Sequence, residues 1–226
     1  MPKPKPYHPS VFTRPSAWIM AFLAAAIAYL FANVQHHRPP GASGTASAAA
    51  MRVFFSPHGG CTRELVSLIN QAHRSIDVEA YSFTSRPIIK ALIAAHRRGV
   101  KVVIILDRSN LMKENYRTHR YTRHPTPALQ ACYAANIPVY IDARYLIAHN
   151  KVMLIDGRTI VTGSFNFSYA AAHFNAENML VVRHAPAIFS AYMKNFTHHQ
   201  LTSQRYVPGL VLKDVFQFPH RRWTGG

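Results

Sequence analysis

The predicted fold depends most on one stretch, SIDVEAYSFTSRPIIKALIAAHRRGVKVVIILD, residues 75–107. Residues 75–83 alternate in polarity, as a β-strand does. Pro87 opens a helical pattern that ends at Gly99. Residues 100–107 form an almost continuous apolar run, which is typical of a strand that is covered on both faces. The stretch therefore predicts a strand, a helix and a second strand in succession.

The rest of the folded part continues this alternation of strands and helices. Further strands are expected at residues 51–55, 137–142, 149–155, 159–165 and 178–183. Further helices are expected at residues 62–73, 126–135 and 186–201. This order predicts an α/β fold: a single catalytic domain over residues 51–203, with a mixed β-sheet covered by helices on both faces.

Composition narrows the class of protein. The chain has 226 residues, of which 26 are Lys or Arg and 9 are Asp or Glu, so its formal net charge is +17. Hydrophobic residues make up 49% and aromatic residues 12%, which excludes a disordered polycation. With 2 cysteines, no Cys-x-x-Cys pair and few acids, we expect neither a metal nor another cofactor. The positive charge favours nucleic acid or an anionic membrane surface as a partner, although a well-solvated surface would have the same charge.

The first fifty residues differ from the rest. Residues 1–16 are basic and rich in proline, and residues 17–34 carry no charge. As a helix, residues 17–34 would span roughly 27 Å, close to the hydrocarbon thickness of a bilayer. Three Lys or Arg precede this segment and one follows it soon after, so the positive-inside rule places the N-terminus in the cytoplasm. We expect either a transmembrane anchor or a cleaved signal segment, followed by a flexible linker at residues 35–50.

The catalytic domain would then be extracytoplasmic, either periplasmic or secreted. In such a compartment Cys61 and Cys132 could be joined by a disulfide, and two buried free thiols are the alternative. Residues 204–226 form a basic aromatic tail.

The segment HNKVMLIDGRTIVTGSFN, residues 149–166, carries the polar residues best suited to catalysis. His149 and Lys151 are two apart on one predicted strand, and Ser164 and Asn166 are two apart on the next. A turn signal, DGRT, separates the strands. Either register with a two-residue loop places all four side chains on one face of a hairpin, whereas an odd-length loop would turn one pair away.

These four side chains suit a phosphodiester substrate. A histidine can attack phosphorus, and the Lys151 ammonium can neutralise a non-bridging oxygen. Ser164 and Asn166 can donate hydrogen bonds to the phosphate oxygens as charge builds on them. The alternative is a hairpin with a polar stripe that faces solvent.

The chain contains the spaced pattern His149-x-Lys151-x4-Asp156-x6-Gly163-Ser164-x-Asn166. This pattern resembles, position for position, the HKD signature of the phospholipase D superfamily. The upstream runs FFSPHGGCT, AYSFTSRPIIKAL and RGVKVVIILD are similar to those of the single-motif bacterial endonucleases of that superfamily. The similarity covers roughly residues 51 to 200.

The resemblance implies a phosphohistidine intermediate on His149 and a second histidine as general acid. An in-line displacement needs groups on opposite sides of phosphorus, so one imidazole cannot serve both roles. Of the 14 histidines, only His149 is followed two positions later by a lysine. The simplest solution is a homodimer in which two chains share one active site. The resemblance also implies that Glu177 orients His149 and that Asp156 and Gly163 support the site.

Two further features bear on substrate binding. A basic and aromatic loop favours single-stranded nucleic acid or is simply solvated; its residues are Arg108, Lys113, Tyr116, Arg117, Arg120, Tyr121 and Arg123. The turn His58-Gly59-Gly60 precedes a predicted helix N-terminus, where an anion could bind.

The leading hypothesis is a metal-independent, non-specific endonuclease that cleaves DNA, or RNA, as a homodimer. The alternative is a phospholipase D that hydrolyses phosphatidyl lipids or cardiolipin at a membrane, to which residues 17–34 would attach it. A third hypothesis, a nucleic-acid-binding protein without activity, is disfavoured by the intact motif.

Overall fold

The computed structural model describes residues 49–115, 117, 120–213 and 215. The predicted N-terminus, anchor or signal segment and most of the linker lie outside the described residues, as does most of the tail. Within the described ranges, no helix has the length and apolar character needed to cross a membrane.

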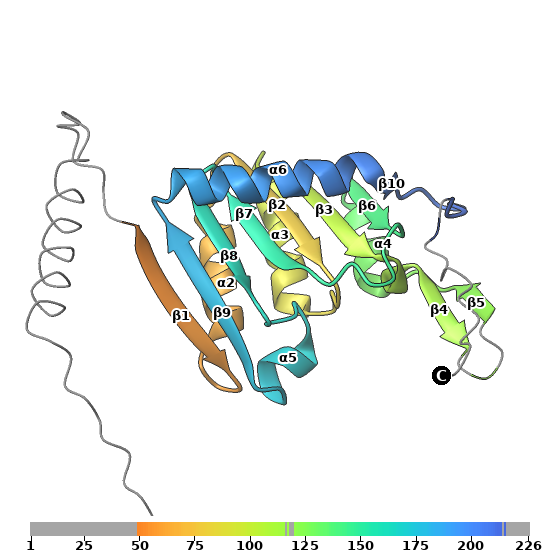
Figure 1. Ribbon diagram of the computed structural model, residues 1–226, viewed down its shortest axis with the longest axis horizontal. Coiled ribbons are helices and arrows are strands. Elements are labelled where there is room, and N and C mark those ends of the chain that lie inside the picture. Colours follow the sequence, from red (N-terminus) through yellow and green to blue (C-terminus); the bar gives the residue numbers. More distant parts are fainter. Residues whose placement is uncertain (1–48, 116, 118–119, 214, 216–226) are drawn as a thin grey trace, which may run out of the picture. The chain divides into compact units, whose positions relative to one another are not determined.

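The centre of the fold is a mixed β-sheet of eight strands (Figure 1). Strands β2, β3 and β6 are parallel to one another, and their neighbours in the sheet are antiparallel. In spatial order the strands are β1 (Ala50–Ser56), β9 (Glu177–Arg183), β8 (Thr159–Gly163), β7 (Lys151–Ile155), β2 (Ser75–Ala80), β3 (Lys101–Asp107), β6 (Val139–Asp142) and β10 (Gln204–Arg205). The predicted mixed sheet is confirmed.

Helices cover both faces of this sheet, as predicted (Figure 1). One face packs against α2 (Cys61–Asn70), α3 (Arg86–Arg97) and α4 (Pro127–Ala134), and the other packs against α6 (Pro186–Thr202). The periodicity of α3 shows why it forms, because its buried residues recur at helical spacing: Ile88, Ile89, Ala91, Leu92 and Ala95.

Five short elements were not predicted, among them β10. The basic loop contains a short 3-10 turn, η1 (Arg108–Asn110), and a two-stranded sheet of β4 (Met112–Asn115) and β5 (Arg120–Arg123). Helix α5 (Tyr169–His173) lies between β8 and β9. Elements of four or five residues are too short to produce a periodic apolar pattern, so the sequence gives little signal for them.

Cys61 and Cys132 are both buried free thiols in the structure. This resolves the open alternative in favour of thiols rather than a disulfide. Burial raises the pKa of both groups, that of Cys132 to about 12, so neither thiol is an activated nucleophile.

The hairpin of β7 and β8 has a different register from the one predicted. Ile155 pairs with Thr159, so three residues, 156–158, form the connection and the predicted two-residue loop is wrong. The reason lies in Asp156, whose N–H donates to Ser75 O at 2.9 Å and which is therefore bonded to the start of β2 instead of closing the hairpin. In a regular ladder this register would turn Ser164 away from the face of Lys151.

The ladder is not regular beyond Gly163. The N–H groups of Ser164 and Phe165 both donate to Asn178 O at 3.1 Å, and this sharing of one carbonyl marks a β-bulge. Strand β7 begins at Lys151, so His149 also lies outside the paired strands. The candidate catalytic residues therefore cluster at strand ends, where the alternation of faces no longer applies.

The bulge predicts a specific sensitivity at Gly163. Its φ is +141°, and a Cβ there would lie 2.4 Å from Asn178 O. We expect Gly163→Ala to lower the free energy of unfolding by about 3 kcal/mol, measured by chemical denaturation. Gly157→Ala is the control: its φ is +73° with no atom within 4 Å, so backbone strain alone should cost about 1 kcal/mol. Equal losses in the two variants would contradict a close approach at Gly163.

Candidate active site

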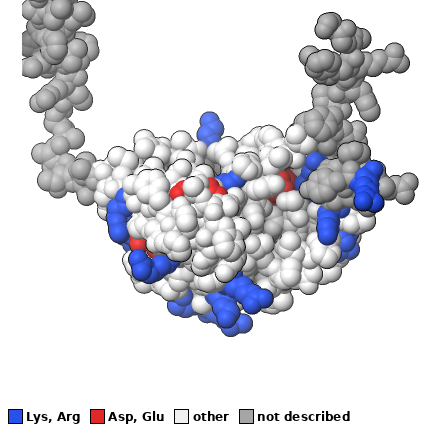
Figure 2. Space-filling model, turned by 90° about the horizontal axis from the view of Figure 1, so that it is seen from below, with Lys and Arg blue, Asp and Glu red and all other residues white. Residues whose placement is uncertain are grey.

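The candidate catalytic residues lie at the edge of the sheet where β2 and β3 end and β7 begins, since Ala80 pairs with Lys151. Figure 2 views the molecule from this edge. Acidic side chains form two patches near the middle of the view with a basic side chain between them, and further Lys and Arg side chains lie along the rim.

His149 and Lys151 are in direct contact. Lys151 Nζ donates to the carbonyl oxygen of His149 at 2.6 Å. The ring of Tyr81 lies 4.7 Å from the imidazole between centroids, and Lys151 Nζ lies 5.0 Å from the same ring centroid. Tyr81 was missed by sequence reasoning, although its place directly after β2 puts it at this edge.

Two buried carboxylates hold the residues on either side of His149, one through a backbone N–H and one through a side-chain amide. Asp107 Oδ2 accepts from Ala148 N at 2.8 Å, and Glu79 Oε2 accepts from Asn150 Nδ2 at 2.6 Å. Asp107 is 3% exposed and Glu79 is 4% exposed. The segment that carries His149 is thus fixed to the ends of both β3 and β2. An acid at the end of an apolar strand was the available signal for Asp107.

Lys151 is buried in a partly acidic environment. Burial lowers the pKa of its ammonium, and the carboxylates of Glu177 and Asp107 oppose that effect. Lys151 and Glu177 therefore interact electrostatically, although they come from strands that are not neighbours in the sheet.

Glu177 is the first residue of β9, where it pairs with Ser56 of β1. Its Oε1 accepts from Asn175 Nδ2 at 3.0 Å. Among the described residues no hydrogen bond joins Glu177 to the His149 ring, so its orienting role stays a prediction.

Ser164 and Asn166 flank the bulge. Ser164 Oγ accepts from the backbone N–H of Asn178 at 3.0 Å and from its Nδ2 at 3.4 Å. Asn166 Oδ1 is buried and has no hydrogen-bond partner in the described part of the chain. An unpaired buried polar atom at a strand end is typical of a site that binds a ligand or water.

Asp156 lies at the opposite end of β7 from Lys151. Its carboxylate accepts from the backbone N–H groups of His73, Arg74 and Ser75 at 2.8–3.2 Å. Burial alone would raise the pKa of Asp156, but these three N–H groups hold it below its usual range. These contacts agree with the expected supporting role and keep Asp156 away from the reaction.

The residues of the basic and aromatic loop that were predicted to bind nucleic acid differ in their exposure. Arg108 is buried at 9% exposure, whereas Lys113, Arg117 and Arg123 are exposed. Tyr116 and the side chains of Arg120 and Tyr121 lie outside what the structure describes.

A second buried polar cluster supports the His149 segment from the side of α6. His199 Nδ1 lies 2.7 Å from Asp142 Oδ2. The hydrogen bond to Asp142 raises the pKa of His199, burial opposes this, and Glu79 adds a further favourable charge. Glu79 also accepts from the side-chain amide of Asn150, so this cluster connects α6 to the residue that follows His149.

The comparisons with known proteins agree with this architecture. A family model described as "Cardiolipin synthase, PLD-like domain" matches residues 65–200, more than half of the chain. The protein is therefore a phosphodiester hydrolase. The chain belongs to the phospholipase D superfamily, and the resemblance found in the sequence is confirmed.

Individual relatives differ in name. A protein named phospholipase D from Rickettsia felis is 38% identical over 149 residues, which cover 66% of this chain and 68% of the relative. A protein named mitochondrial cardiolipin hydrolase from Xenopus laevis is 30% identical over 135 residues, which cover 60% of this chain and 58% of the relative.

Two solved structures show the same fold. Nuc from Salmonella typhimurium, a phospholipase D family member, is 32% identical with a TM-score of 0.61, and the match covers 70% of this chain and 98% of Nuc. NucT from Helicobacter pylori has a TM-score of 0.58 at 23% identity, over 70% of this chain and 99% of NucT. NucT supports the fold alone.

The buried His199–Asp142 pair predicts a pH dependence of stability. Because the pKa of His199 is raised in the folded state, its contribution is fully present below the unfolded pKa of about 6.5 and is lost as pH rises through the folded pKa. We expect the difference in unfolding free energy between the wild type and His199→Asn to shrink from about pH 6 to about pH 9. A difference for His199→Asn that does not change with pH would refute the pairing.

Proposed function

We propose that the chain is a metal-independent phosphodiesterase that acts through a phosphohistidine on His149, and that its substrate is nucleic acid, DNA or RNA, cleaved endonucleolytically. The observation that carries this proposal is the contact of the buried Lys151 ammonium with the His149 backbone at 2.6 Å. A fixed imidazole beside a fixed positive charge suits attack on a phosphodiester.

In the proposed reaction, a neutral His149 imidazole attacks phosphorus and forms a P–N bond. The P–O bond to the leaving group breaks, and an imidazolium gives that oxygen its proton. Water then attacks phosphorus and gives a proton to the second imidazole, the P–N bond breaks, and His149 is released as a neutral imidazole with a phosphomonoester as product. An unperturbed histidine pKa of about 6.5 makes one neutral and one protonated ring accessible near neutrality.

The remaining residues would stabilise the phosphate. Lys151 would neutralise a non-bridging oxygen. The backbone N–H and the Nδ2 group of Asn178 both donate to Ser164 Oγ. The hydroxyl proton of Ser164 can therefore be donated to a second non-bridging oxygen of the phosphate. The Asn166 amide would donate to the phosphate, and Glu177 would orient the imidazole. These roles rest on the superfamily's signature.

Charge favours nucleic acid as the substrate. Four Lys or Arg precede residue 51, so residues 51–226 keep 26 − 4 = 22 basic residues against 9 acidic ones, a net charge of +13. Most of the Lys and Arg side chains in Figure 2 lie around the outer edge of this face of the molecule. The upstream resemblance to single-motif bacterial endonucleases points to the same substrate.

A second candidate, a phospholipase D acting on phosphatidyl lipids or cardiolipin, is favoured by one observation. Edge strand β1 exposes a row of apolar side chains: Met51 at 65%, Val53 at 54% and Phe55 at 60%. This strand follows the predicted membrane segment in the chain, so its apolar row would suit a lipid surface. The names of the Rickettsia and Xenopus relatives agree with such a substrate.

The predicted location belongs to the same proposal. Residues 17–34 would anchor the chain in the membrane or direct its export, and the catalytic domain would act outside the cytoplasm. Limited proteolysis of spheroplasts, whose inner membrane is intact, would test this arrangement, because a cytoplasmic domain would be protected and a periplasmic one would be cut.

The first functional prediction concerns metal independence. The purified chain should cut single- and double-stranded DNA in excess EDTA, and His149→Asn should lower the rate by more than about 10³-fold. His198→Asn, which replaces an exposed imidazole, should retain activity. Loss of cleavage in chelator would refute the mechanism.

The same preparations should be assayed on vesicles of phosphatidylcholine and of cardiolipin. Release of the lipid head group without DNA cleavage would favour the second candidate over the first. Tight, salt-dependent DNA binding without cleavage of DNA or lipid would favour the third hypothesis, a nucleic-acid-binding protein without activity.

A further prediction concerns the shared site. If each site needs one His149 from each of two chains, only wild-type homodimers are active. Full-length wild type refolded with an equal amount of His149→Asn should then keep about a quarter of the activity of an all-wild-type sample at the same total concentration. Independent sites would keep about half, and a monomer in sedimentation would also exclude the homodimer.

A further inference from the structure

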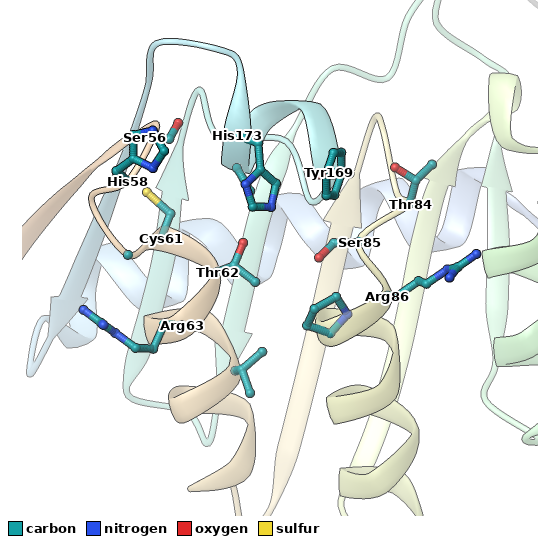
Figure 3. Close-up of a pocket in the computed structure, with 14 residues that line it drawn as sticks. Ser56, His58, Cys61, Thr62, Arg63, Thr84, Ser85, Arg86, Tyr169 and His173 are labelled. Atoms are coloured by element: carbon teal, nitrogen blue, oxygen red, sulfur yellow. The ribbon is translucent and has the colours of Figure 1, made fainter.

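A cavity lies between the N-terminal ends of α2 and α3, beside α5 (Figure 3). It has a volume of about 920 Å³. None of the residues assigned above to the phosphodiesterase reaction lines it, so the cavity has no role in that chemistry.

Both helix ends in this cavity lack a capping side chain. Helix α2 has 10 residues with Gly60 at its N-cap, and α3 has 12 residues with Ser85 at its N-cap. Neither N-cap residue makes a side-chain hydrogen bond to its helix. Free N–H groups and the positive ends of two helix dipoles thus face one space, which is a favourable environment for an anion.

Two buried hydroxyls point to a ligand independently of the helix ends. Ser85 is 3% exposed, and its hydroxyl, which makes no cap hydrogen bond, faces the cavity (Figure 3). Thr62 Oγ1 is buried without a hydrogen-bond partner among the described residues. Buried hydroxyls are normally paired, so the unpaired Thr62 hydroxyl beside a Ser85 hydroxyl that does not cap its helix indicates a binding partner that is absent from the chain itself.

The charges around the cavity select an anion. Arg63 and Arg86 lie on opposite sides of the cavity with their guanidinium groups turned outward, His173 lies on α5 above it, and no Asp or Glu is among the described residues that line it. The rings of Tyr169 and His173 lie 4.2 Å apart between centroids, and Tyr169 is 61% exposed. An exposed aromatic ring beside a phosphate site suits stacking of a nucleic-acid base.

The cavity also shares its walls with the candidate catalytic centre. Ser56, which lines it, pairs with Glu177 in the sheet. The N–H of Ser85 donates to Phe167 O at 2.9 Å, one residue from Asn166. A nucleic-acid strand that extends from the catalytic centre would therefore reach this cavity next.

We propose that the cavity is a second phosphate-binding subsite, which holds a non-scissile phosphate of a nucleic-acid strand whose scissile phosphate lies at His149. This inference rests on the proposed function. The first-turn N–H groups of both helices and the hydroxyls of Thr62 and Ser85 donate to the phosphate, and Arg63 and Arg86 attract it.

The test compares a substrate that has several phosphates with one that has a single phosphate. The full chain is assayed on an oligothymidylate and on bis(p-nitrophenyl) phosphate, and the ratio of the two kcat/KM values is measured. The double variant Thr62→Val with Ser85→Ala should lower this ratio at least about tenfold, because hydrogen bonds to a charged group are lost. Thr197→Val, on α6 and outside the cavity, is the control and should leave the ratio as it is.

A charge variant provides a second measurement. Arg63→Gln with Arg86→Gln should lower the same ratio and weaken its dependence on salt. Arg97→Gln, at the far end of α3, should leave both as they are. An unchanged ratio in both double variants would overturn the proposal. A lower ratio of cardiolipin to phosphatidylglycerol hydrolysis, with the nucleotide ratio unchanged, would overturn the assignment to nucleic acid.

Direct binding separates this proposal from the proposed function. Inorganic phosphate titrated into the full-length His149→Asn protein should shift the amide resonances of the first turns of α2 and α3, and Thr62→Val with Ser85→Ala should abolish these shifts. Absence of the shifts would overturn the subsite even if DNA is cut. If the wild type hydrolyses neither diester, the proposed function fails while the titration still tests the cavity.

Discussion

The arrangement of the candidate site depends on the two carboxylates that hold the neighbours of His149. Asp107 binds the backbone N–H of Ala148 and Glu79 binds the side-chain amide of Asn150, and both carboxylates are buried at the ends of parallel strands. Burying two acids is costly unless each is hydrogen-bonded. Their partners therefore place His149 at a fixed position on the edge of the sheet, and the contact between Lys151 and His149 O follows from that position.

Strand β7 has a supporting residue at one end and a candidate catalytic residue at the other. At one end, Asp156 binds three successive backbone N–H groups and joins the hairpin to the start of β2. At the other end, Lys151 interacts with Glu177 across the sheet. The spacing of the HKD signature thus reflects the length of one strand, with an anchoring residue at one end and the candidate catalytic pair at the other.

Sequence reasoning predicted the long, periodic elements and the mixed sheet, because buried strands such as β3 and amphipathic helices such as α3 have strong apolar patterns. It also found the polar residues that the structure gathers at one edge. It failed at the hairpin register, because Asp156 bonds to β2 and a bulge follows Gly163. The turn His58-Gly59-Gly60 indicated a possible anion site at the α2 end of the cavity. Glu79, Tyr81 and the α3 side of the cavity were missed, since contacts between distant strands and helix ends leave no local pattern.

The proposed covalent intermediate on His149 can be trapped. The full-length protein would be mixed with an oligonucleotide, quenched within one turnover at alkaline pH, where phosphohistidine is stable, and digested for tandem mass spectrometry. We expect a nucleotidyl adduct on the His149 imidazole that is absent from His149→Asn. Turnover without an adduct, or an adduct on another residue, would contradict it.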